Sequence, residues 1–493
     1  MTDILFGQAY YLRFDPKLYA AMKPYPPLGT LYAASYLRAR GYAVALFDAM
    51  LAESESEWTR ALERYQPRVA VLFEDNFNYL SKMCLVRMRY AAFEMIGAAK
   101  TRGCIVVVSG SDATDHCAEY FARGADYILI GEGEITLAEL MDTLNASPKS
   151  IAPDLKLDEI KGLAFKAQDN SIVTNAPREY IRELDALPFP AWDLIDVERY
   201  RRIWKTRHGF FSMNLVTTRG CPYHCNWCAK PIYGQRYNVR SAANVVAEIK
   251  WLKEKYQPDH LEFADDIFGL KPNWIEEFAD LTAANNLQIP FKCLLRADLL
   301  SETMVDALER AGCEMVWMGA ESGSQKILDA MDKGQRVSEI YTAAERLRRV
   351  GIRIGFFLQF GYLGETRADI ERTLQMLRDC APDDIGISVS YPLPGTKFYA
   401  RVREQLGAKQ NWNDSADLAM MYRGAYSSAF YRELHQRVHA EFRFRRALGK
   451  LKRDPARLAL TMLLNFIRWQ FARVRLKQLE HMPVLPSLAV AKQ

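Results

Sequence analysis

Short apolar runs alternate with amphipathic stretches over the first third of the chain. The amphipathic stretches, such as residues 28–41 and 86–102, have apolar positions three and four apart and predict helices. The apolar runs have the length of strands and are residues 3–6, 43–48, 68–73, 104–109 and 127–130. Alternating strands and helices predict an α/β fold, here a Rossmann-like doubly wound parallel sheet. Ligands of such sheets bind beyond the carboxyl ends of the strands.

A second alternating series begins near residue 206 and ends near residue 400. Its six strand-like runs are residues 212–217, 260–263, 290–294, 315–318, 354–360 and 386–390. Six βα units in series predict a partial (β/α)6 TIM-type barrel, whose site lies at the carboxyl ends of its strands. Between the two series, apolar runs at 162–165 and 171–174 predict a hairpin. Beyond residue 400 the pattern is helical.

These boundaries predict a Rossmann-like domain at residues 1–141, a linker with the hairpin at 142–205, the barrel at 206–400 and a C-terminal helical region at 401–493. The chain of 493 residues is 49% apolar with a net charge of +5, which is typical of a globular protein. No basic run interleaved with aromatic residues indicates nucleic-acid binding. The N-terminus lacks the features of a signal peptide, and no apolar segment is long enough to cross a bilayer. We therefore expect a cytoplasmic protein.

Three cysteines stand in one short run, directly after the first strand of the second series. Cys221, Cys225 and Cys228 are separated by three and then two residues. Thiolates at such short spacings can converge on one iron–sulfur cluster, and three ligands leave the fourth iron of a cubane open to a small molecule. The alternatives are three unrelated thiols or a zinc site with His224 as fourth ligand. The other six cysteines show no ligand spacing and are interpreted as mostly buried thiols.

The cysteine run resembles the CxxxCxxC signature of the radical SAM superfamily. Later segments match the same family in order, and they are residues 262–268 (EFADDIF), 319–324 (GAESGS), 359–366 (QFGYLGET) and 391–396 (YPLPGT). The first domain resembles the cobalamin-binding domain of many such enzymes at Pro26-Pro-Leu-Gly29, Ser109-Gly-Ser111 and Gly131-Glu-Gly-Glu134. A Rossmann-like domain that binds a nucleotide or no ligand is the alternative. The chain is identified by these motifs as similar to the cobalamin (B12)-binding radical SAM enzymes.

The resemblance implies roles for individual residues. Trp227 covers the cluster or touches adenine, Asp265 or Asp266 accepts from the ammonium group of S-adenosylmethionine, and Arg296 faces its carboxylate. Glu321 and Ser322 hold the ribose hydroxyls and the methionyl carboxylate. The residues expected to approach the cobalamin ring are Ser109, Gly110, Ser111, Gly131, Glu132, Gly133 and Glu134. For each set, packing, an ordinary barrel ion pair or a tight turn is the structural alternative.

Two departures from the family pattern are visible. Tyr362 and Leu363 stand where the fifth-strand segment usually has a Pro, so the conformation of that loop is open. The DxHxxG motif, whose His becomes the lower cobalt ligand, is absent, and the only His of the first domain is His116. We expect His116 to lie at the surface or at a helix start, and the lower face of cobalamin to have no His ligand.

The resemblance implies an enzyme that uses a 4Fe-4S cluster, S-adenosylmethionine and cobalamin. It would act on an unactivated carbon of a small-molecule or lipid-like substrate. The expected reaction is C-methylation, as in class B methyltransferases. The alternatives are an oxidative cyclisation or rearrangement, as in anaerobic cyclases, and a non-catalytic cobalamin sensor. The expected electron donor is a flavodoxin or a ferredoxin.

The C-terminal region is rich in Arg and Lys, and its apolar segment at residues 458–467 ends at Arg468. Trp469 and Phe471 with the neighbouring basic residues suit a helix on an anionic lipid surface, which would make the protein peripheral to the membrane. The favoured interpretation is a helix packed on the barrel with a solvated basic face. His435 and His439 are four residues apart and share a helix face, but two His alone make a poor metal site.

Overall fold

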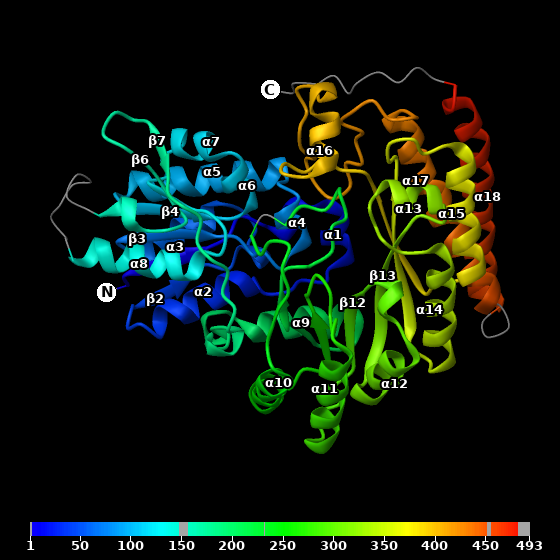
Figure 1. Cartoon of the computed structure of the whole chain (residues 1–493), viewed down its shortest axis with the longest axis horizontal. Helices are drawn as coiled ribbons and strands as arrows, with labels where there is room; N and C mark the ends of the chain where they lie inside the picture. The colour runs from blue at the N-terminus through cyan, green and yellow to red at the C-terminus, as the bar shows by residue number, and fades with distance from the viewer. Residues whose placement is uncertain (1, 147–155, 231, 451–454, 482–493) are drawn as a thin grey trace.

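The computed structural model describes residues 2–146, 156–230, 232–450 and 455–481. It confirms the α/β class, with one sheet in the first part of the chain and a second sheet in the next. Figure 1 shows the two sheets side by side, with two long C-terminal helices at the outer edge of the second. The first sheet is therefore far from those helices.

The first sheet has the strand order β2-β1-β3-β4-β5-β6-β7. Its strands are β1 (Ile4–Gly7), β2 (Val44–Leu46), β3 (Val69–Phe73), β4 (Ile105–Ser109), β5 (Tyr127–Leu129), β6 (Leu163–Lys166) and β7 (Ile172–Thr174). The first five are parallel, whereas β6 and β7 pair antiparallel at one edge. The hairpin that was expected within the linker therefore extends this sheet.

Side chains on both faces of the first sheet are buried because a strand presents successive residues to opposite faces. In β3, Val69, Val71 and Phe73 face one hydrophobic cluster, and Ala70 and Leu72 face another. The helices of this part are α1 (Pro16–Ala21), α2 (Leu28–Arg38), α3 (Ser56–Tyr65), α4 (Tyr79–Lys82), α5 (Val86–Thr101), α6 (Ser111–Asp115), α7 (Cys117–Ala122) and α8 (Gly133–Ala146). Helices α2 and α8 cover the first face, and α3, α5 and α7 cover the second.

The second sheet is a six-stranded parallel half-barrel with the order β15-β14-β13-β12-β11-β8. Its strands are β8 (Ser212–Leu215), β11 (His260–Phe263), β12 (Phe291–Leu295), β13 (Cys313–Glu321), β14 (Arg353–Phe360) and β15 (Asp384–Val389). The helices of this part are α9 (Val197–His208), α10 (Ala242–Tyr256), α11 (Pro272–Ala284), α12 (Glu302–Ala311), α13 (Gln325–Ala330), α14 (Val337–Arg349), α15 (Arg367–Cys380) and α16 (Lys397–Val402). The partial barrel predicted from six βα units is confirmed.

Two long helices form a hairpin on the outer side of the half-barrel, α17 (Ser428–Lys450) and α18 (Pro455–Leu479). Helix α17 is attached to α15 by ion pairs from Arg378 to Glu441 and from Arg437 to Glu371. Helix α18 packs on α17 and lies at the edge of the molecule (Figure 1). Within the described residues, no helix combines the length and apolarity that crossing a membrane requires.

A buried ion cluster joins the two sheets next to the cysteine run. Arg219 lies in the short strand β9 (Thr218–Arg219), which pairs antiparallel with β10 (Asn238–Val239). Its guanidinium contacts Glu132 at 3.2 Å and Glu134 at 2.7 Å, and all three side chains are at most 3% exposed. Glu132 comes from the turn after β5 and Glu134 from the first turn of α8, where the sequence suggested contacts to cobalamin. In this structure they hold the half-barrel against the first sheet.

Replacing Arg219 by Met is expected to lower the free energy of unfolding by about 3–5 kcal/mol, because it leaves two buried carboxylates without a cation. The triple variant E132Q/E134Q/R219M removes the charges together and is expected to regain most of that loss. Chemical denaturation of the cofactor-free protein measures both changes.

The matched control is Arg353→Met, which breaks an exposed ion pair with Glu314. Exposed pairs contribute about 0–1 kcal/mol, so this variant should unfold almost as the parent does. An Arg219→Met protein as stable as the Arg353→Met protein would contradict the assigned role of the cluster.

Candidate functional site

The three cysteines lie in a loop that starts two residues after Arg219, at the carboxyl end of the half-barrel. Asn226, inside the loop, fixes it to the barrel. The amide nitrogen of Asn226 donates to the carbonyl of Met331 at 3.0 Å, and its side-chain oxygen accepts from the Tyr362 hydroxyl at 2.6 Å. Tyr362 is the residue that departs from the family pattern, and it forms an anchor for the cysteine loop. The sequence analysis singled out neither Asn226 nor this contact.

The three thiols lie close enough for their charges to interact. The pKa of Cys228 is raised to about 12, chiefly by burial, with smaller contributions from Asp266, Cys221 and Cys225 and an opposing one from Lys230. His224, the possible zinc ligand, is exposed and contacts the Gln235 side chain at 3.0 Å. Among the residues that the structure describes, no three His, Cys, Asp or Glu side chains are arranged to hold a single metal ion.

A short segment of the first domain reaches this loop. Lys82, at the end of α4, forms an ion pair with Asp266 at 2.5 Å across the two parts of the chain. Burial is the largest single effect on the pKa of Lys82 and lowers it. Asp266 and, to a smaller extent, the charges of Cys228 and Cys221 raise this pKa, and the net result is above its ordinary value. Tyr79, which starts α4, is 56% exposed yet lies near Cys228 and Glu321. Tyr79 and Lys82 thus bring the first domain next to the cysteine loop.

The two aspartates expected near S-adenosylmethionine have partners already. Asp265 is buried and accepts hydrogen bonds from the amides and hydroxyls of Thr217 and Thr218 at 2.6–3.1 Å. It thereby joins the ends of β11 and β8. Asp266 is held by Lys82 and is more exposed than Asp265. Of the two, Asp266 is the one that a ligand can reach by displacing a single partner.

Arg296 lies beside the cysteine loop. Its guanidinium pairs with Asp298 at 2.9 Å, stacks on the Tyr223 ring at 3.8 Å from the ring centre, and lies 3.9 Å from the Cys225 sulfur. It also donates to the carbonyl oxygen of Lys333 at 2.8 Å. Arg296 thus forms the ordinary ion pair with Asp298 that was the alternative to a ligand contact, and it is also a direct neighbour of the Cys225 thiol.

Glu321 is the last residue of β13, and Ser322 follows it directly. Glu321 has a positive φ of 56° and pairs with Lys333 at 3.0 Å, with both side chains buried. A non-glycine residue in this conformation is uncommon and concentrates at functional sites. The Ser322 hydroxyl contacts Thr373 at 3.1 Å and accepts from the Ser324 amide at 3.1 Å, so it also shapes the turn.

Several buried polar atoms at the site have no hydrogen-bond partner among the described residues. Near the cysteines this holds for the indole nitrogen of Trp227 and the side-chain oxygen of Gln335. At the edge of the first sheet it holds for atoms of Gln8, Glu74, Asn76, Ser109 and Ser111. Buried polar groups are nearly always paired, so two groups of unpaired atoms indicate where ligands with polar groups bind.

The edge of the first sheet also holds a close backbone approach. A Cβ atom on Gly133 would lie 2.7 Å from the Phe73 ring and 2.9 Å from the Ser109 hydroxyl. Glu74 lies between this edge and β1, where it accepts from the Ala9 amide at 2.9 Å through one oxygen. Burial raises the pKa of Glu74 to about 8, an effect that the Ala9 amide opposes and Asp112 reinforces. Glu74 was not singled out by the sequence, because a lone Glu after a strand carries no motif.

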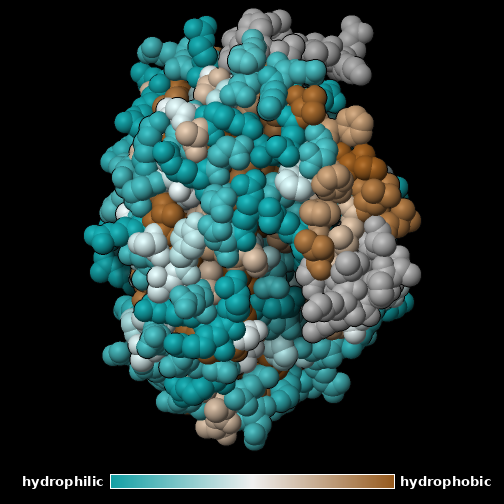
Figure 2. Space-filling view, turned by 90° about the vertical axis from the view of Figure 1, so that its right-hand side faces the viewer, coloured by the Kyte–Doolittle hydropathy of each residue, from teal (hydrophilic) through white to brown (hydrophobic). Residues whose placement is uncertain are grey.

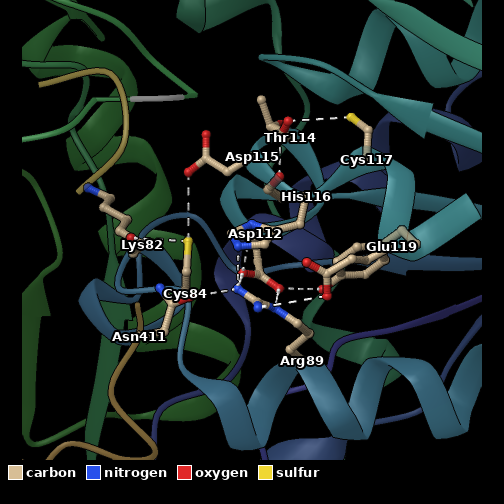
Figure 3. Close-up of polar contacts among 12 residues, drawn as sticks. Lys82, Cys84, Arg89, Asp112, Thr114, Asp115, His116, Cys117, Glu119 and Asn411 are labelled. Carbon is tan, nitrogen blue, oxygen red and sulfur yellow. Dashed lines mark hydrogen bonds and ion pairs between the residues drawn. The ribbon is translucent and has the colours of Figure 1, made fainter. Parts of the chain in front are cut away.

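His116 is held in a polar cluster away from these unpaired atoms. It precedes α7, and its Nε2 atom is 2.9 Å from Arg89, which also forms two hydrogen bonds to Asp112 (Figure 3). Arg89 further donates to Asn411 at 3.0 Å and so connects α5 to the segment after the barrel. These contacts tie His116 to α5 and α6.

Comparison with known proteins agrees with these features. Residues 215–377 match the family model described as the Radical SAM superfamily. A protein of Pyrococcus horikoshii named as an uncharacterized methyltransferase is 25% identical, with 78% of this chain and 81% of the relative covered. The anaerobic magnesium-protoporphyrin IX monomethyl ester cyclase of Synechocystis is also 25% identical, covering 77% of this chain and 73% of the cyclase.

A solved structure shares the whole arrangement of sheets. It is the cobalamin-dependent S-adenosylmethionine radical enzyme OxsB with aqua-cobalamin and S-adenosylmethionine bound, which is 18% identical to this chain. The superposition has a TM-score of 0.70 and covers 99% of this chain and 76% of OxsB, so the two proteins share their fold. From the family match and the named relatives together, the chain is a radical SAM enzyme.

Proposed function

We propose that this enzyme is a C-methyltransferase that uses a 4Fe-4S cluster, S-adenosylmethionine and cobalamin to methylate an unactivated carbon of a small-molecule substrate. The observation that carries the proposal is that the half-barrel and the first sheet each have a candidate binding site and that the two sites are connected. The three-thiol loop of the half-barrel and the unpaired polar edge of the first sheet are connected by Lys82, Asp266 and the Arg219 cluster. Relatives named as methyltransferases support the choice of reaction.

Cys221, Cys225 and Cys228 would hold the cluster. When bound, the cluster supplies the electron that breaks a carbon–sulfur bond of S-adenosylmethionine, and cobalamin supplies the carrier of the methyl group. Around the thiols, Lys230 and Arg296 place positive charge that offsets the negative charge of three thiolates. Asn226 fixes the loop to the barrel, so that the open side of the cluster keeps one orientation.

S-adenosylmethionine would bind between the cysteine loop and the end of β13. The Trp227 indole nitrogen and the Gln335 side-chain oxygen have no hydrogen-bond partner among the described residues and could bind it, together with Glu321 and Ser322. Asp266 is the acceptor proposed for the ammonium group, because a buried ammonium without a partner is costly. Asp265 acts through Thr217 and Thr218 by holding the strand ends in place.

Cobalamin would bind at the edge of the first sheet. Ser109, Ser111, Asn76 and Gln8 have unpaired polar atoms for the amide groups of a corrin ring, and Gly133 lets α8 start close against Phe73 and Ser109. Gly110 and Gly131 form the neighbouring turns. Because the sequence has no DxHxxG motif, the proposed binding mode has no His ligand to cobalt. The proposed electron donor is a flavodoxin or ferredoxin.

The test of the proposed reaction is its set of products. The enzyme is reconstituted anaerobically and incubated with S-adenosylmethionine, a reductant and a metabolite extract of its host. Methyl transfer to carbon consumes two molecules of S-adenosylmethionine for each product, so S-adenosylhomocysteine and 5′-deoxyadenosine should appear in equal amounts. Mass spectrometry measures both.

Replacing Cys221, Cys225 or Cys228 by Ala should abolish 5′-deoxyadenosine formation, and the control Cys117→Ala should leave it unchanged. Formation of 5′-deoxyadenosine without S-adenosylhomocysteine would replace methyl transfer by cyclisation or rearrangement. Formation of neither compound by the parent protein would favour a non-catalytic sensor.

Glu74 provides a second prediction that does not depend on activity. Its pKa in the folded protein is about 8, against an ordinary value near 4.5, because the side chain is buried. The unfolded chain therefore releases this proton first, and stability is lost as the pH rises from about 4.5 to about 8. Glu74→Gln stays neutral and keeps the acceptor for Ala9. The melting temperature of the cofactor-free variant should match the parent near pH 5 and exceed it above pH 8.

The control is Glu345→Gln, which removes an exposed carboxylate on α14. A difference between the parent and Glu74→Gln that stays constant from pH 5 to 9 would show that Glu74 does not titrate in this range. Cobalamin retention after gel filtration, measured for both variants from the visible spectrum, shows separately whether Glu74 belongs to the ring site.

A further inference from the structure

Helix α18 exposes a continuous apolar stripe on its outer side. Its positions recur alternately every four and three residues, which places them on one face of a helix. They are Leu460, Leu464, Ile467, Phe471 and Val474. Phe471 is 74% exposed and Leu460 is 63% exposed. Figure 2 shows apolar residues gathered along one edge of this side of the molecule.

The opposite face of α18 accounts for its attachment to the protein. Asn465, Ala472 and Leu476 are buried against α17. The helix therefore has a packed side already, and the stripe is a second apolar face that the described residues leave uncovered. A contiguous exposed apolar surface of this kind marks an interaction site.

The charges of α18 have one sign. Between Pro455 and Leu479 the helix has five basic residues and no Asp or Glu. Arg468 and Arg475 directly border the stripe, and both are exposed. Arg468 has no hydrogen-bond or ion-pair partner in the described part of the chain, and Arg475 contacts Glu433 at 3.4 Å. The occupant of the stripe must therefore bring negative charge.

A second copy of the chain does not meet this requirement. Stripes from two copies would pack in the manner of a coiled coil, and the flanking positions would then set Arg468 and Arg475 against basic residues of the same helix. Like charges at such positions are destabilising. The chain's own last residues, 481–493, also include no Asp or Glu.

A hollow with arginines lies beside the stripe, between α17 and α18. Its volume is about 800 Å³. Arg443, Arg468 and Arg475 line it on the polar side together with Glu433, which pairs with Arg475 and leaves the other two arginines in excess, and Phe471 and Val474 of the stripe line it on the apolar side. Burial lowers the pKa of His435 to about 3 and that of His439 to about 4, so these two His add no charge to the hollow. A phosphate group attached to an acyl chain fits this combination.

We propose that the α17–α18 hairpin docks on an anionic phospholipid surface, with the stripe in the interfacial layer and a lipid phosphate in the arginine-lined hollow. The helix lies in the plane of the membrane, since it does not have the properties of a spanning helix. The surface is separate from the catalytic site. A failure of this proposal therefore leaves S-adenosylmethionine cleavage unaffected, and a failure of the proposed reaction leaves lipid binding unaffected.

Flotation of the full-length protein with vesicles tests the proposal. The protein should float with vesicles that contain phosphatidylglycerol and stay in solution with vesicles of phosphatidylcholine alone. Partition should fall at least about tenfold in L464S/F471S, which interrupts the stripe, and in R443Q/R468Q, which neutralises the hollow. High salt should release the protein from the anionic vesicles, because screening weakens attraction to the surface.

The matched controls are Tyr90→Ser, an exposed aromatic residue on α5, and R202Q/R207Q, exposed basic residues on α9. Both should bind vesicles as the parent does. Quenching of Trp469 fluorescence by brominated phosphatidylglycerol, absent in Trp469→Phe, gives a readout that requires no change to the stripe.

Three outcomes would overturn the proposal. They are no binding to anionic vesicles, equal binding by the stripe variant and the controls, and a dimer in sedimentation that L464S/F471S dissociates. The last would make a second copy the occupant. Binding to an acidic protein with no binding to vesicles would make a protein the occupant and would equally reject the lipid surface.

Discussion

The buried contact of Arg219 with Glu132 and Glu134 is the constraint on which the geometry of the site depends. Arg219 stands two residues before Cys221, and the two glutamates stand in the turn after β5 and in the first turn of α8. Tyr32, Phe77 and Tyr233 surround the guanidinium within 6 Å and exclude water from it. An ion cluster with so little solvent has few alternative arrangements, so the cysteine loop keeps one position relative to the first sheet.

Other contacts also position the loop. Asn226 and Tyr362 fix it to the half-barrel through a hydrogen bond, and the ion pair of Lys82 with Asp266 joins the first domain to the barrel beside it. Three of these four residues come from the barrel side and one from the first domain. A rigid loop between two sheets suits a reaction in which two cofactors must act on one substrate carbon, because positioning then comes from the protein before the substrate arrives.

The sequence predicted much of this fold because its elements follow local patterns. The strand runs at 260–263 and 127–130 match β11 and β5 within a residue, and the position of the cysteines directly after the first strand of the second series placed the loop at the mouth of the barrel. Lys82 and Tyr79 were missed because α4 has four residues and its partners are about 150 or more positions away. Asp265 and Asp266 belong to one motif, but only the structure shows that Asp265 binds Thr217 and Thr218 whereas Asp266 binds Lys82. Tyr362 departs from the family pattern, and only the fold shows that its hydroxyl binds Asn226 and so fixes the cysteine loop.

The position of Arg219 has a consequence for how such enzymes can be recombined. The arginine belongs to the half-barrel and its two glutamates to the first domain, so the contact forms only when both parts carry their members. A chimera that joins this first module to another barrel inherits two buried acids and loses their cation. Exchange of modules in this class is therefore restricted to pairs that carry both members of the contact, and the two halves of the chain are expected to have diverged together rather than independently.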